Sequence, residues 1–378
     1  MNITSTDAEK PDRGQIEEWL QPFPEGVRKM LFAVIDRPDF ALRVVKMALH
    51  LRQHALNKVP QYWEDLALLG RRLAPRDPEV RFLSERALRT KVPSWHFALV
   101  HDQLRNEAFR KALEYFVKPS TIVFEIGTGS GILAMMAARA GARHVYTCEM
   151  EGLLAEAAKE NIRANGYADR ITVIPKRSTD LVLGTDMPHR ADLFVAEIVD
   201  NFLLGEKVLP FLEDARSRLL KAEAIILPSR IASVGALVGG STWTRNCRVD
   251  DVAGFDLSAM NRLAPCQKTV SGDRELDDVF CAPFELFSFD LAHDNAFPHE
   301  KKRIGVEIIL NGRVDGLVSW LRLDFYQNSV FENRPPQKSA WWPVLHLFPT
   351  PIEVRVGEQF FMNVAHDREH IYVEPDGR

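Results

Sequence analysis

The chain has 378 residues, of which 46% are hydrophobic and 26% charged, proportions that exclude a wholly disordered or collagen-like protein. Its 48 Lys and Arg residues against 52 Asp and Glu residues leave a formal net charge of −4. Because nucleic-acid binding over a broad surface needs an excess of basic residues, we expect no direct nucleic-acid binding. The length accommodates two domains, or one domain with a substantial addition.

The cysteines and the N-terminus indicate where the protein resides. Cys148, Cys247, Cys266 and Cys281 lie far apart and form no C-x-x-C pair, so neither a disulfide framework nor a zinc-type metal site is expected. Residues 1–14 are polar where a secretory signal needs an apolar core, and no apolar run reaches the roughly 18 residues that cross a bilayer. The sequence predicts a soluble, cytoplasmic protein with no membrane partner.

The first part of the chain has a helical pattern. Residues 1–14 are expected to form a flexible tail, and residues 15–92 a helical annex in which apolar residues recur at three- and four-residue steps. The stretch 63–73, followed by a new helix from Pro78, resembles a tetratricopeptide-type hairpin, although no clean repeat of roughly 34 residues is evident. A plain helical extension packed on the next domain is an equally good interpretation.

The middle of the chain alternates short apolar runs with helical patterns. The apolar runs predict strands at 121–124, 145–148, 171–174 and 191–195, and the intervening patterns predict helices that include 131–140 and 153–165. This βαβα order is typical of a parallel, doubly wound α/β sheet. We expect a Rossmann-like domain over residues 93–228.

Beyond Pro228 the helical pattern gives way to alternating or apolar runs. Predicted strands lie at 231–237, 305–310, 316–325 and 352–356. Such short strands favour an antiparallel, barrel-like domain over residues 229–378. Residues 241–266 are polar and irregular, so we expect an insertion or arm there.

The clearest motif is EIGTGSG at residues 125–131, between a predicted strand and a predicted helix. Glycines at 127, 129 and 131 allow the backbone to approach a ligand closely, and the start of the helix offers unpaired N–H groups. The spacing differs from G-x-G-x-x-G, and the P-loop lysine is missing. Glu149 follows the next predicted strand, where a carboxylate can accept both hydroxyls of a ribose. Together the two features predict a nucleotide-type cofactor.

Residues 125–149 resemble the S-adenosylmethionine motif of class I methyltransferases, and specifically of the protein arginine N-methyltransferase family. Two further segments are similar to that family: HDQLRN at 101–106 resembles the segment that closes over the cofactor, and EIVDNFLLGE at 197–206 resembles the double-glutamate loop. The resemblance runs from about residue 95 to the last residue and leaves the helical annex unexplained. It implies a class I Rossmann-like domain followed by a β-barrel domain, with S-adenosyl-L-methionine as the cofactor.

The resemblance also implies roles for individual residues in cofactor binding. Arg105 would pair with the methionine carboxylate. Glu125, where the family usually has Asp, would support the glycine loop or the methionine amino group. Ser178 follows a predicted strand and is the adenine candidate, although an ordinary turn is an equally good interpretation. The complete predicted set is Arg105, Glu125, Gly127, Thr128, Gly129, Gly131, Glu149 and Ser178.

The two glutamates of residues 197–206 can be assigned a role from their chemistry, without the resemblance. A guanidinium is always charged and presents a planar fork of donors, which two carboxylates can hold with one nitrogen aimed at a sulfonium methyl. We therefore predict that Glu197 and Glu206 are catalytic and bind the guanidinium, and that Glu206 or a relay accepts the proton. The implied substrate is an arginine in a protein or peptide.

Asp200 bears on the number of methyl groups transferred. It matches an acidic residue of the type III, monomethylating branch of the family, so the resemblance implies monomethylation. Such an acid would reshape the guanidinium pocket and bind on the substrate side. An exposed loop acid is the other interpretation of the same residue.

Two segments depart from the family pattern. Ser339, Ala340 and Trp341 stand where the family has Thr-His-Trp, so Trp341 can still form a wall of the arginine channel through cation–π attraction. Ala340 cannot supply the hydrogen bond of the histidine. The aromatic segment before the closing helix is PSWHF at 93–97, which keeps aromatic cover without tyrosine hydroxyls. His366 resembles part of an acid–histidine pair, but a buried barrel histidine is the better interpretation.

The resemblance further implies a homodimer, in which residues 241–266 form the arm that docks on the cofactor domain of a partner. Two other functions stay open. The protein could use the same cofactor with a different nucleophile, against which the two facing carboxylates weigh. It could also be a non-catalytic scaffold that binds partners through the helical annex, an interpretation that the missing loop histidine favours.

Overall fold

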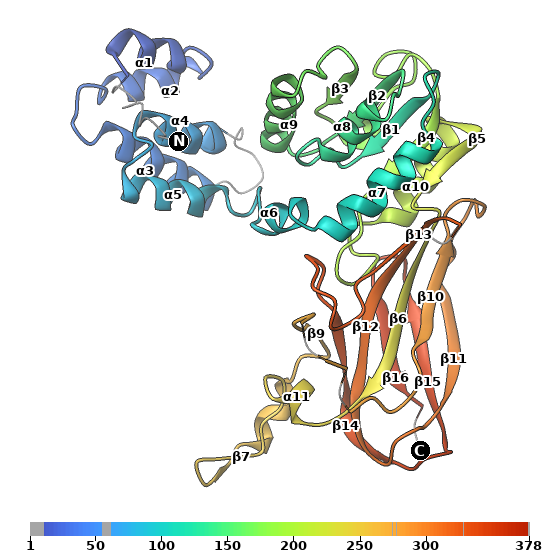
Figure 1. Cartoon of the computed structure of the whole chain (residues 1–378). Helices are drawn as coiled ribbons and strands as arrows, with labels where there is room; N and C mark the ends of the chain where they lie inside the picture. The colour runs from blue at the N-terminus through green and yellow to red at the C-terminus, as the bar shows by residue number, and fades with distance from the viewer. Residues whose placement is uncertain (1–10, 55–61, 274, 277, 328, 377–378) are drawn as a thin grey trace, which may run out of the picture. The chain divides into compact units, whose positions relative to one another are not determined.

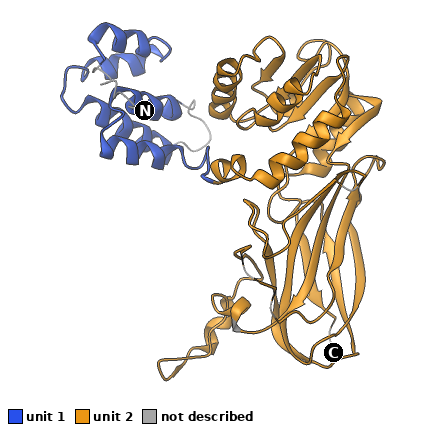
Figure 2. Cartoon of the chain, viewed as in Figure 1, with its two compact units in different colours: residues 1–94 blue, residues 95–378 orange. Residues whose placement is uncertain are grey.

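The computed structural model describes residues 11–54, 62–273, 275–276, 278–327 and 329–376. Most of the predicted tail, residues 1–10, therefore lies outside the described residues. The chain forms two compact units, residues 1–94 and residues 95–378 (Figure 2). No helix in the described ranges combines the length and the apolar character that crossing a membrane requires.

The first unit is helical in all its described elements, which confirms the predicted N-terminal helices. Asp77 begins the last of them as an N-cap, since its side chain accepts a hydrogen bond from the Val80 amide at 2.9 Å. Gly70 lets two helices approach closely, because a Cβ there would lie 2.0 Å from the Val45 side chain. The helices are α1 (Arg13–Leu20), α2 (Glu25–Phe32), α3 (Phe40–His54), α4 (Tyr62–Leu73) and α5 (Pro78–Leu88).

The second unit starts with two helices and a parallel sheet, as predicted for a Rossmann-like domain (Figure 1). The sheet has the order β3-β2-β1-β4-β5, so the chain reverses its direction of travel across the sheet between β1 and β4. Ligands of such sheets bind outside the carboxyl ends of the strands at this reversal. The elements are α6 (Trp95–Val100), α7 (Gln103–Phe116), β1 (Ile122–Ile126), α8 (Ile132–Arg139), β2 (His144–Cys148), α9 (Gly152–Ala164), β3 (Ile171–Ile174), β4 (Ala191–Ala196), α10 (Val208–Arg218) and β5 (Leu220–Leu227).

The rest of the unit consists of antiparallel strands, which confirms the predicted barrel-type domain. One sheet has the order β10-β6-β12-β14-β9 with β13 paired to β12, and a second has the order β11-β15-β16. The strands are β6 (Arg230–Val238), β9 (Gln267–Thr269), β10 (Phe284–Asp290), β11 (Glu300–Glu307), β12 (Gly312–Tyr326), β13 (Ser329–Glu332), β14 (Val344–Val354), β15 (Gln359–His366) and β16 (Ile371–Pro375).

Two barrel strands differ most from their predicted bounds, and β12, predicted from residue 316, starts earlier, at Gly312. The strand predicted at 305–310 is β11, which starts at Glu300 and ends at Glu307. As an edge strand with charged side chains, β11 lacks the apolar alternation that marks a buried strand. The strand predicted at 352–356 is the end of β14, whose two prolines interrupt the pattern close to a register shift in its pairing with β12.

Residues 241–266 form an arm that projects from the barrel (Figure 1). Its base is fixed by the Gly240 amide, which donates to the buried carboxylate of Asp315 at 2.8 Å. The arm contains α11 (Ser241–Thr244), the two-stranded β7 (Asp251–Val252) and β8 (Phe255–Asp256), and the 3₁₀ helix η2 (Ser258–Leu263).

The barrel packs directly on helix α7. Phe325 of β12 meets Phe109 of α7 edge to face, with ring centroids 4.8 Å apart. Tyr326 stacks on Tyr115 with centroids 4.4 Å apart. This packing fixes the barrel relative to the helix that precedes β1, and one barrel loop, residues 339–342, contacts the segment that follows β4.

Candidate active site

The glycine loop, residues 125–131, turns sharply from β1 into α8. Gly127, Gly129 and Gly131 have φ angles of +84°, +51° and +83°, which favour glycine. The Gly127 amide donates to the Cys148 carbonyl at the end of β2 at 3.0 Å. A Cβ at Gly127 would lie 3.0 Å from the Ile198 side chain, whereas nothing lies within 4 Å of one at Gly129. The loop is therefore packed at Gly127 and open at Gly129.

Thr128 and Glu149 hold this loop in place. The Thr128 and Thr147 hydroxyls lie 2.6 Å apart in the interior. The Glu149 carboxylate accepts a hydrogen bond from the Gly129 amide at 3.0 Å and one from the Glu151 amide at 2.9 Å. Each carboxylate oxygen has a second lone pair, so Glu149 retains acceptors for the predicted ribose hydroxyls.

Glu125 is almost completely buried, with 1% of its surface exposed. Among the described residues, neither carboxylate oxygen has a hydrogen-bond partner of normal geometry. Burial raises the pKa of Glu125 to about 8, although the Thr147 hydroxyl and the Arg105 charge oppose the increase. A cationic amino group beside Glu125 would supply the missing partner, and the methionine amino group is one of the two partners predicted for it.

Ser178 begins a 3₁₀ turn, η1 (Ser178–Asp180), just after β3. Its side chain is buried, and its carbonyl accepts a hydrogen bond from the Arg218 guanidinium at 3.1 Å. The turn is thus anchored to α10, and the adenine role of Ser178 stays a prediction.

Arg105 and Glu197, predicted for two different ligands, form an ion pair with each other. Arg105 lies in the first turn of α7, and Glu197 follows β4 directly. A second nitrogen of the guanidinium donates to the Asn106 side chain at 2.7 Å. Burial raises the pKa of Glu197, and the Arg105 charge opposes the increase. The cation predicted to bind the cofactor and the anion predicted to bind the substrate therefore lie in direct contact.

Glu206, at the other end of this loop, is half-buried, and no basic side chain in the described ranges forms an ion pair with it. Burial raises its pKa to about 8, and repulsion from Glu197 and Asp200 adds to the increase. The acidic side chains do not gather as metal ligands would, since no group of three His, Cys, Asp or Glu in the described chain could hold a metal ion. A bound guanidinium would supply the counter-charge that Glu206 lacks.

Asp200 braces the loop between the two glutamates. One carboxylate oxygen accepts hydrogen bonds from the Phe202 amide at 3.1 Å and the Gly205 amide at 3.0 Å. Burial raises the pKa of Asp200, while these amides oppose the increase. A Cβ at position 205 would lie 2.2 Å from the other Asp200 oxygen. Asp200 thus shapes the loop next to Glu206, and its predicted contact with substrate stays a prediction.

Trp341 connects the barrel to the same loop. Its indole nitrogen donates to the Val199 carbonyl at 2.9 Å, and its ring packs edge to face on Phe331 at 5.3 Å. The Trp342 amide donates to the Asn201 side chain at 2.7 Å. Only 4% of the Trp341 surface is exposed, so the structure gives it a supporting contact with the loop, and its role as a channel wall stays a prediction.

Asp102 is a site residue that the sequence analysis missed. One oxygen caps α7 by accepting from the Arg105 amide at 3.0 Å. The other accepts from the Ser339 hydroxyl at 2.6 Å and from the Ala340 amide at 3.0 Å. An Asp directly before a helix is a recognisable N-cap signal, but only the fold shows its second set of partners.

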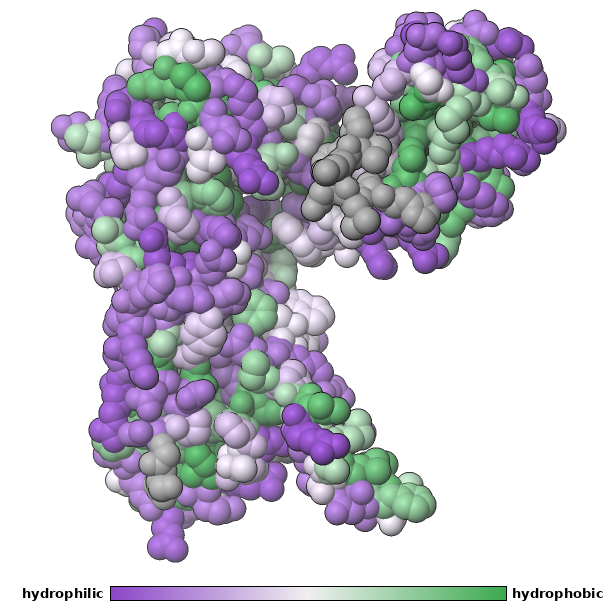
Figure 3. Space-filling view, turned by 180° about the vertical axis from the view of Figure 1, so that it is seen from behind, coloured by the Kyte–Doolittle hydropathy of each residue, from purple (hydrophilic) through white to green (hydrophobic). Residues whose placement is uncertain are grey.

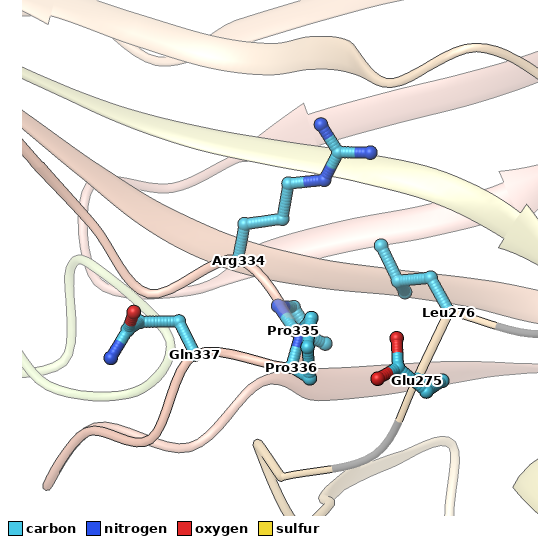
Figure 4. A pocket seen from close by; sticks show the side chains of 6 residues that line it. All are labelled: Glu275, Leu276, Arg334, Pro335, Pro336 and Gln337. Atoms are coloured by element: carbon cyan, nitrogen blue, oxygen red, sulfur yellow. The ribbon is translucent and has the colours of Figure 1, made fainter.

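A cavity of about 520 Å³ lies in the barrel domain, and none of the residues that line it was predicted for the site (Figure 4). Its lining comes from two segments, residues 275–276 and 334–337, the second of which leads into Ser339. The lining residues are Glu275, Leu276, Arg334, Pro335, Pro336 and Gln337.

Comparison with known sequences points to one family. The family model for ribosomal protein L11 methyltransferase matches residues 110–233. An arginine N(omega)-methyltransferase of Streptomyces achromogenes subsp. streptozoticus is 38% identical over 283 residues, which cover 73% of this chain and 77% of the relative. A protein arginine N-methyltransferase 7 of Drosophila grimshawi is 28% identical over 321 residues, which cover 73% of this chain and 46% of the relative. The chain thus spans about half the length of the second relative.

Solved structures agree on the fold. The Trypanosoma brucei PRMT1 enzyme–prozyme heterotetrameric complex with AdoHcy has a TM-score of 0.64 at 22% identity, covering 75% of this chain and 94% of that chain. Arabidopsis thaliana protein arginine methyltransferase 10 has a TM-score of 0.60 at 21% identity, covering 73% and 88%. The predicted cofactor, S-adenosyl-L-methionine, is the one that the family uses. This chain and the Streptomyces relative are 38% identical over an alignment that covers 77% of that relative, so the chain belongs to the protein arginine N-methyltransferase family.

Proposed function

We propose that this protein transfers a methyl group from S-adenosyl-L-methionine to a guanidinium nitrogen of arginine in a protein or peptide, and that it produces monomethylarginine. The observation that carries the proposal is the position of Glu197 and Glu206. Both lie on one loop after β4, beside the glycine loop that follows the neighbouring strand β1.

The chemistry required of the chain is modest. When bound, S-adenosylmethionine supplies an electrophilic methyl group on a sulfonium. Glu197 and Glu206 hold the planar guanidinium and fix the direction of its attacking nitrogen. Arg105 binds the methionine carboxylate next to this pair. Glu206 accepts the proton that the methylated nitrogen loses, a role that suits a carboxylate whose pKa burial raises to about 8.

Monomethylation rests on Asp200, which resembles the acid of the type III branch. Its hydrogen bond to the Gly205 amide fixes the backbone immediately before Glu206. With that backbone fixed, Glu206 cannot shift easily to admit a nitrogen that already carries a methyl group.

Free arginine is a second candidate acceptor. The Streptomyces relative is named for arginine, whereas the Drosophila relative is named for protein arginine. Both acceptors present the same guanidinium, so the site residues would serve either one.

The arm is the part of the proposal that concerns assembly. Its apolar side chains are exposed, with Phe255 70% and Leu263 77% accessible, and Figure 3 shows hydrophobic surface along it. We propose that the arm docks on the cofactor domain of a second copy to form a homodimer. Burial of such side chains in an interface would stabilise it.

We also propose domain boundaries for the chain and a cellular location for the protein. These boundaries assign residues 15–92 to a helical annex, 93–228 to the cofactor domain and 229–378 to the barrel domain with the arm at 241–266. A cytoplasmic location is supported by the four cysteines, all of which are free.

The test supplies labelled S-adenosylmethionine together with arginine peptides, free L-arginine or a lysine-rich peptide, and identifies products by mass spectrometry. We expect monomethylarginine and no labelled lysine. Glu197→Gln should abolish transfer while calorimetry shows intact binding of S-adenosylhomocysteine. Dimethylarginine would refute monomethylation, and labelled lysine would indicate a different nucleophile. Cofactor binding without any transfer would favour the scaffold interpretation.

A further inference from the structure

Three segments meet at the site, and each pair of them is joined. They are the start of α7, residues 102–106; the acceptor loop, residues 197–206; and the barrel loop, residues 339–342. Arg105 joins the first to the second through Glu197. Trp341 and Trp342 join the third to the second. Asp102 joins the first to the third and closes the ring.

Asp102 is suited to this joint because its two oxygens have different partners. One oxygen holds the Arg105 amide within its own helix, and the other holds Ser339 and Ala340, which are more than 200 residues away in the chain. The side chain is buried, and hydrogen bonds to a charged carboxylate are stronger than those between neutral groups.

Ala340 contributes only its backbone N–H to the joint, so the Ser339 hydroxyl is the one side-chain donor that the described barrel loop gives to Asp102. The same hydroxyl accepts a hydrogen bond from the Trp341 amide at 3.2 Å. Ser339 therefore connects Asp102 to the residue whose indole holds the acceptor loop.

We propose that Ser339 and Asp102 form a latch that positions the barrel loop on the acceptor loop and so completes the guanidinium site. Both are positioning residues, since they act through Trp341 and Trp342 and not on the reacting atoms. The proposal rests on the proposed function, because it concerns the acceptor side of the same site.

Loss of the latch is expected to weaken the binding of the arginine acceptor and not that of the cofactor. The glycine loop and Glu149 are held by their own hydrogen bonds, none of which involves Ser339. Removal of the Ser339 hydroxyl leaves the Asp102 cap on α7 in place, and with it the position of Arg105. Loss of the latch should therefore weaken acceptor binding and leave cofactor binding unchanged.

The first test compares Ser339→Ala with Ser339→Thr, which keeps the hydroxyl. A hydrogen bond to a charged group contributes about a 10- to 100-fold difference in equilibrium constant. We expect Ser339→Ala to raise the KM for the arginine acceptor about tenfold or more by that measure, to change kcat less, and to leave the Kd of S-adenosylhomocysteine within about twofold. Ser339→Thr should restore the KM. An unchanged KM, or an equal loss of cofactor binding, would overturn the latch.

The second test needs no acceptor. Hydrogen exchange followed by mass spectrometry should show faster exchange of the barrel-loop amides in Ser339→Ala than in the parent protein. Ser217→Ala is the matched control, since it removes an exposed hydroxyl on α10 that bonds only to the nearby Asp214 carbonyl. If the parent transfers no methyl to arginine, the proposed function fails, and exchange alone decides the latch. Equal exchange in parent and variant would then refute it.

Discussion

The glycine loop and the acceptor loop follow neighbouring strands, yet they are stabilised in different ways. At the glycine loop, the Glu149 carboxylate already accepts hydrogen bonds from the Gly129 and Glu151 amides, and the loop glycines have positive φ angles that favour glycine. In the acceptor loop, Glu197 is paired with Arg105, and Glu206 has a raised pKa and an acidic environment. The glycine loop is thus preorganised by its own backbone, whereas in the proposed mechanism the acceptor loop is completed by the charge of the guanidinium that it binds.

The largest expected effect comes from removing the Glu206 carboxylate, which is proposed to bind the guanidinium. Glu206→Gln should reduce kcat/KM for the arginine acceptor by about two to three orders of magnitude, a typical cost of losing one electrostatic contact to the reacting group. Cofactor affinity should stay the same, because the glycine loop does not depend on Glu206. Steady-state kinetics and calorimetry would check both. A kcat/KM within tenfold of the parent value would show that the two loops do not differ in this way.

Two alanine substitutions test the preorganised loop. Gly127→Ala places a methyl group against Ile198 at a φ of +84°, where an L-residue costs about 1–2 kcal/mol in backbone strain. In Gly129→Ala the added Cβ meets no other atom within 4 Å, so only backbone strain and a steric clash with a bound ligand would disfavour the substitution. We expect both to weaken S-adenosylhomocysteine binding by about tenfold or more in line with that strain, and Gly127→Ala to lower Tm further. Equal Tm values would contradict the packing difference.

Acceptor binding should depend on pH. With a pKa of about 8 in the free protein, Glu206 is mostly neutral at pH 7 and anionic above pH 8. Since the guanidinium binds the anion, the acceptor KM should fall as the pH rises from about 6.5 to 8.5, by up to about tenfold per pH unit. The same series with Glu206→Gln should be flat over that range. A KM that rises with pH would refute the assignment.

The smallest effect concerns stability. A buried carboxyl group whose pKa is raised on folding favours the folded state below its ordinary pKa, and that contribution is lost as the pH rises through the folded value. Glu125, with a pKa of about 8, should therefore make Tm fall between about pH 5 and pH 8 in the ligand-free protein. Glu125→Gln should make this fall in Tm smaller by a few degrees, as measured by scanning calorimetry. A parent Tm that is constant across this window would contradict it.

Four of the five strands of the parallel sheet could be predicted because they contain short apolar runs, whereas β5 was missed because residues 221–223 at its start are exposed. β1 is buried at every position, and its predicted counterpart at 121–124 differs by one or two residues at each end. The barrel was less predictable, since an edge strand such as β11 carries charged side chains that read as a loop. Strand identity there depends on pairing with distant partners, which local pattern does not contain.

The candidate site shows the same limit. The glycines and the two glutamates could be placed from motif and spacing. The contact between Asp102 and Ser339 could not, because the two residues are 237 positions apart and only the fold brings them together. The raised pKa values of Glu125 and Glu206 likewise depend on burial, which the sequence alone does not reveal.

The packing of Phe325 and Tyr326 on α7 has a consequence for recombination between family members. A chimera joined at Pro228 would combine the barrel of one parent with the α7 of another, and the ring pairs at Phe109 and Tyr115 would be lost wherever the second parent has other residues there. Helix α7 and the barrel should therefore come from the same parent, although the strands of the parallel sheet lie between them in the sequence. Productive crossovers should fall between α7 and β1 and again after β5, so that the sheet is exchanged as an insert.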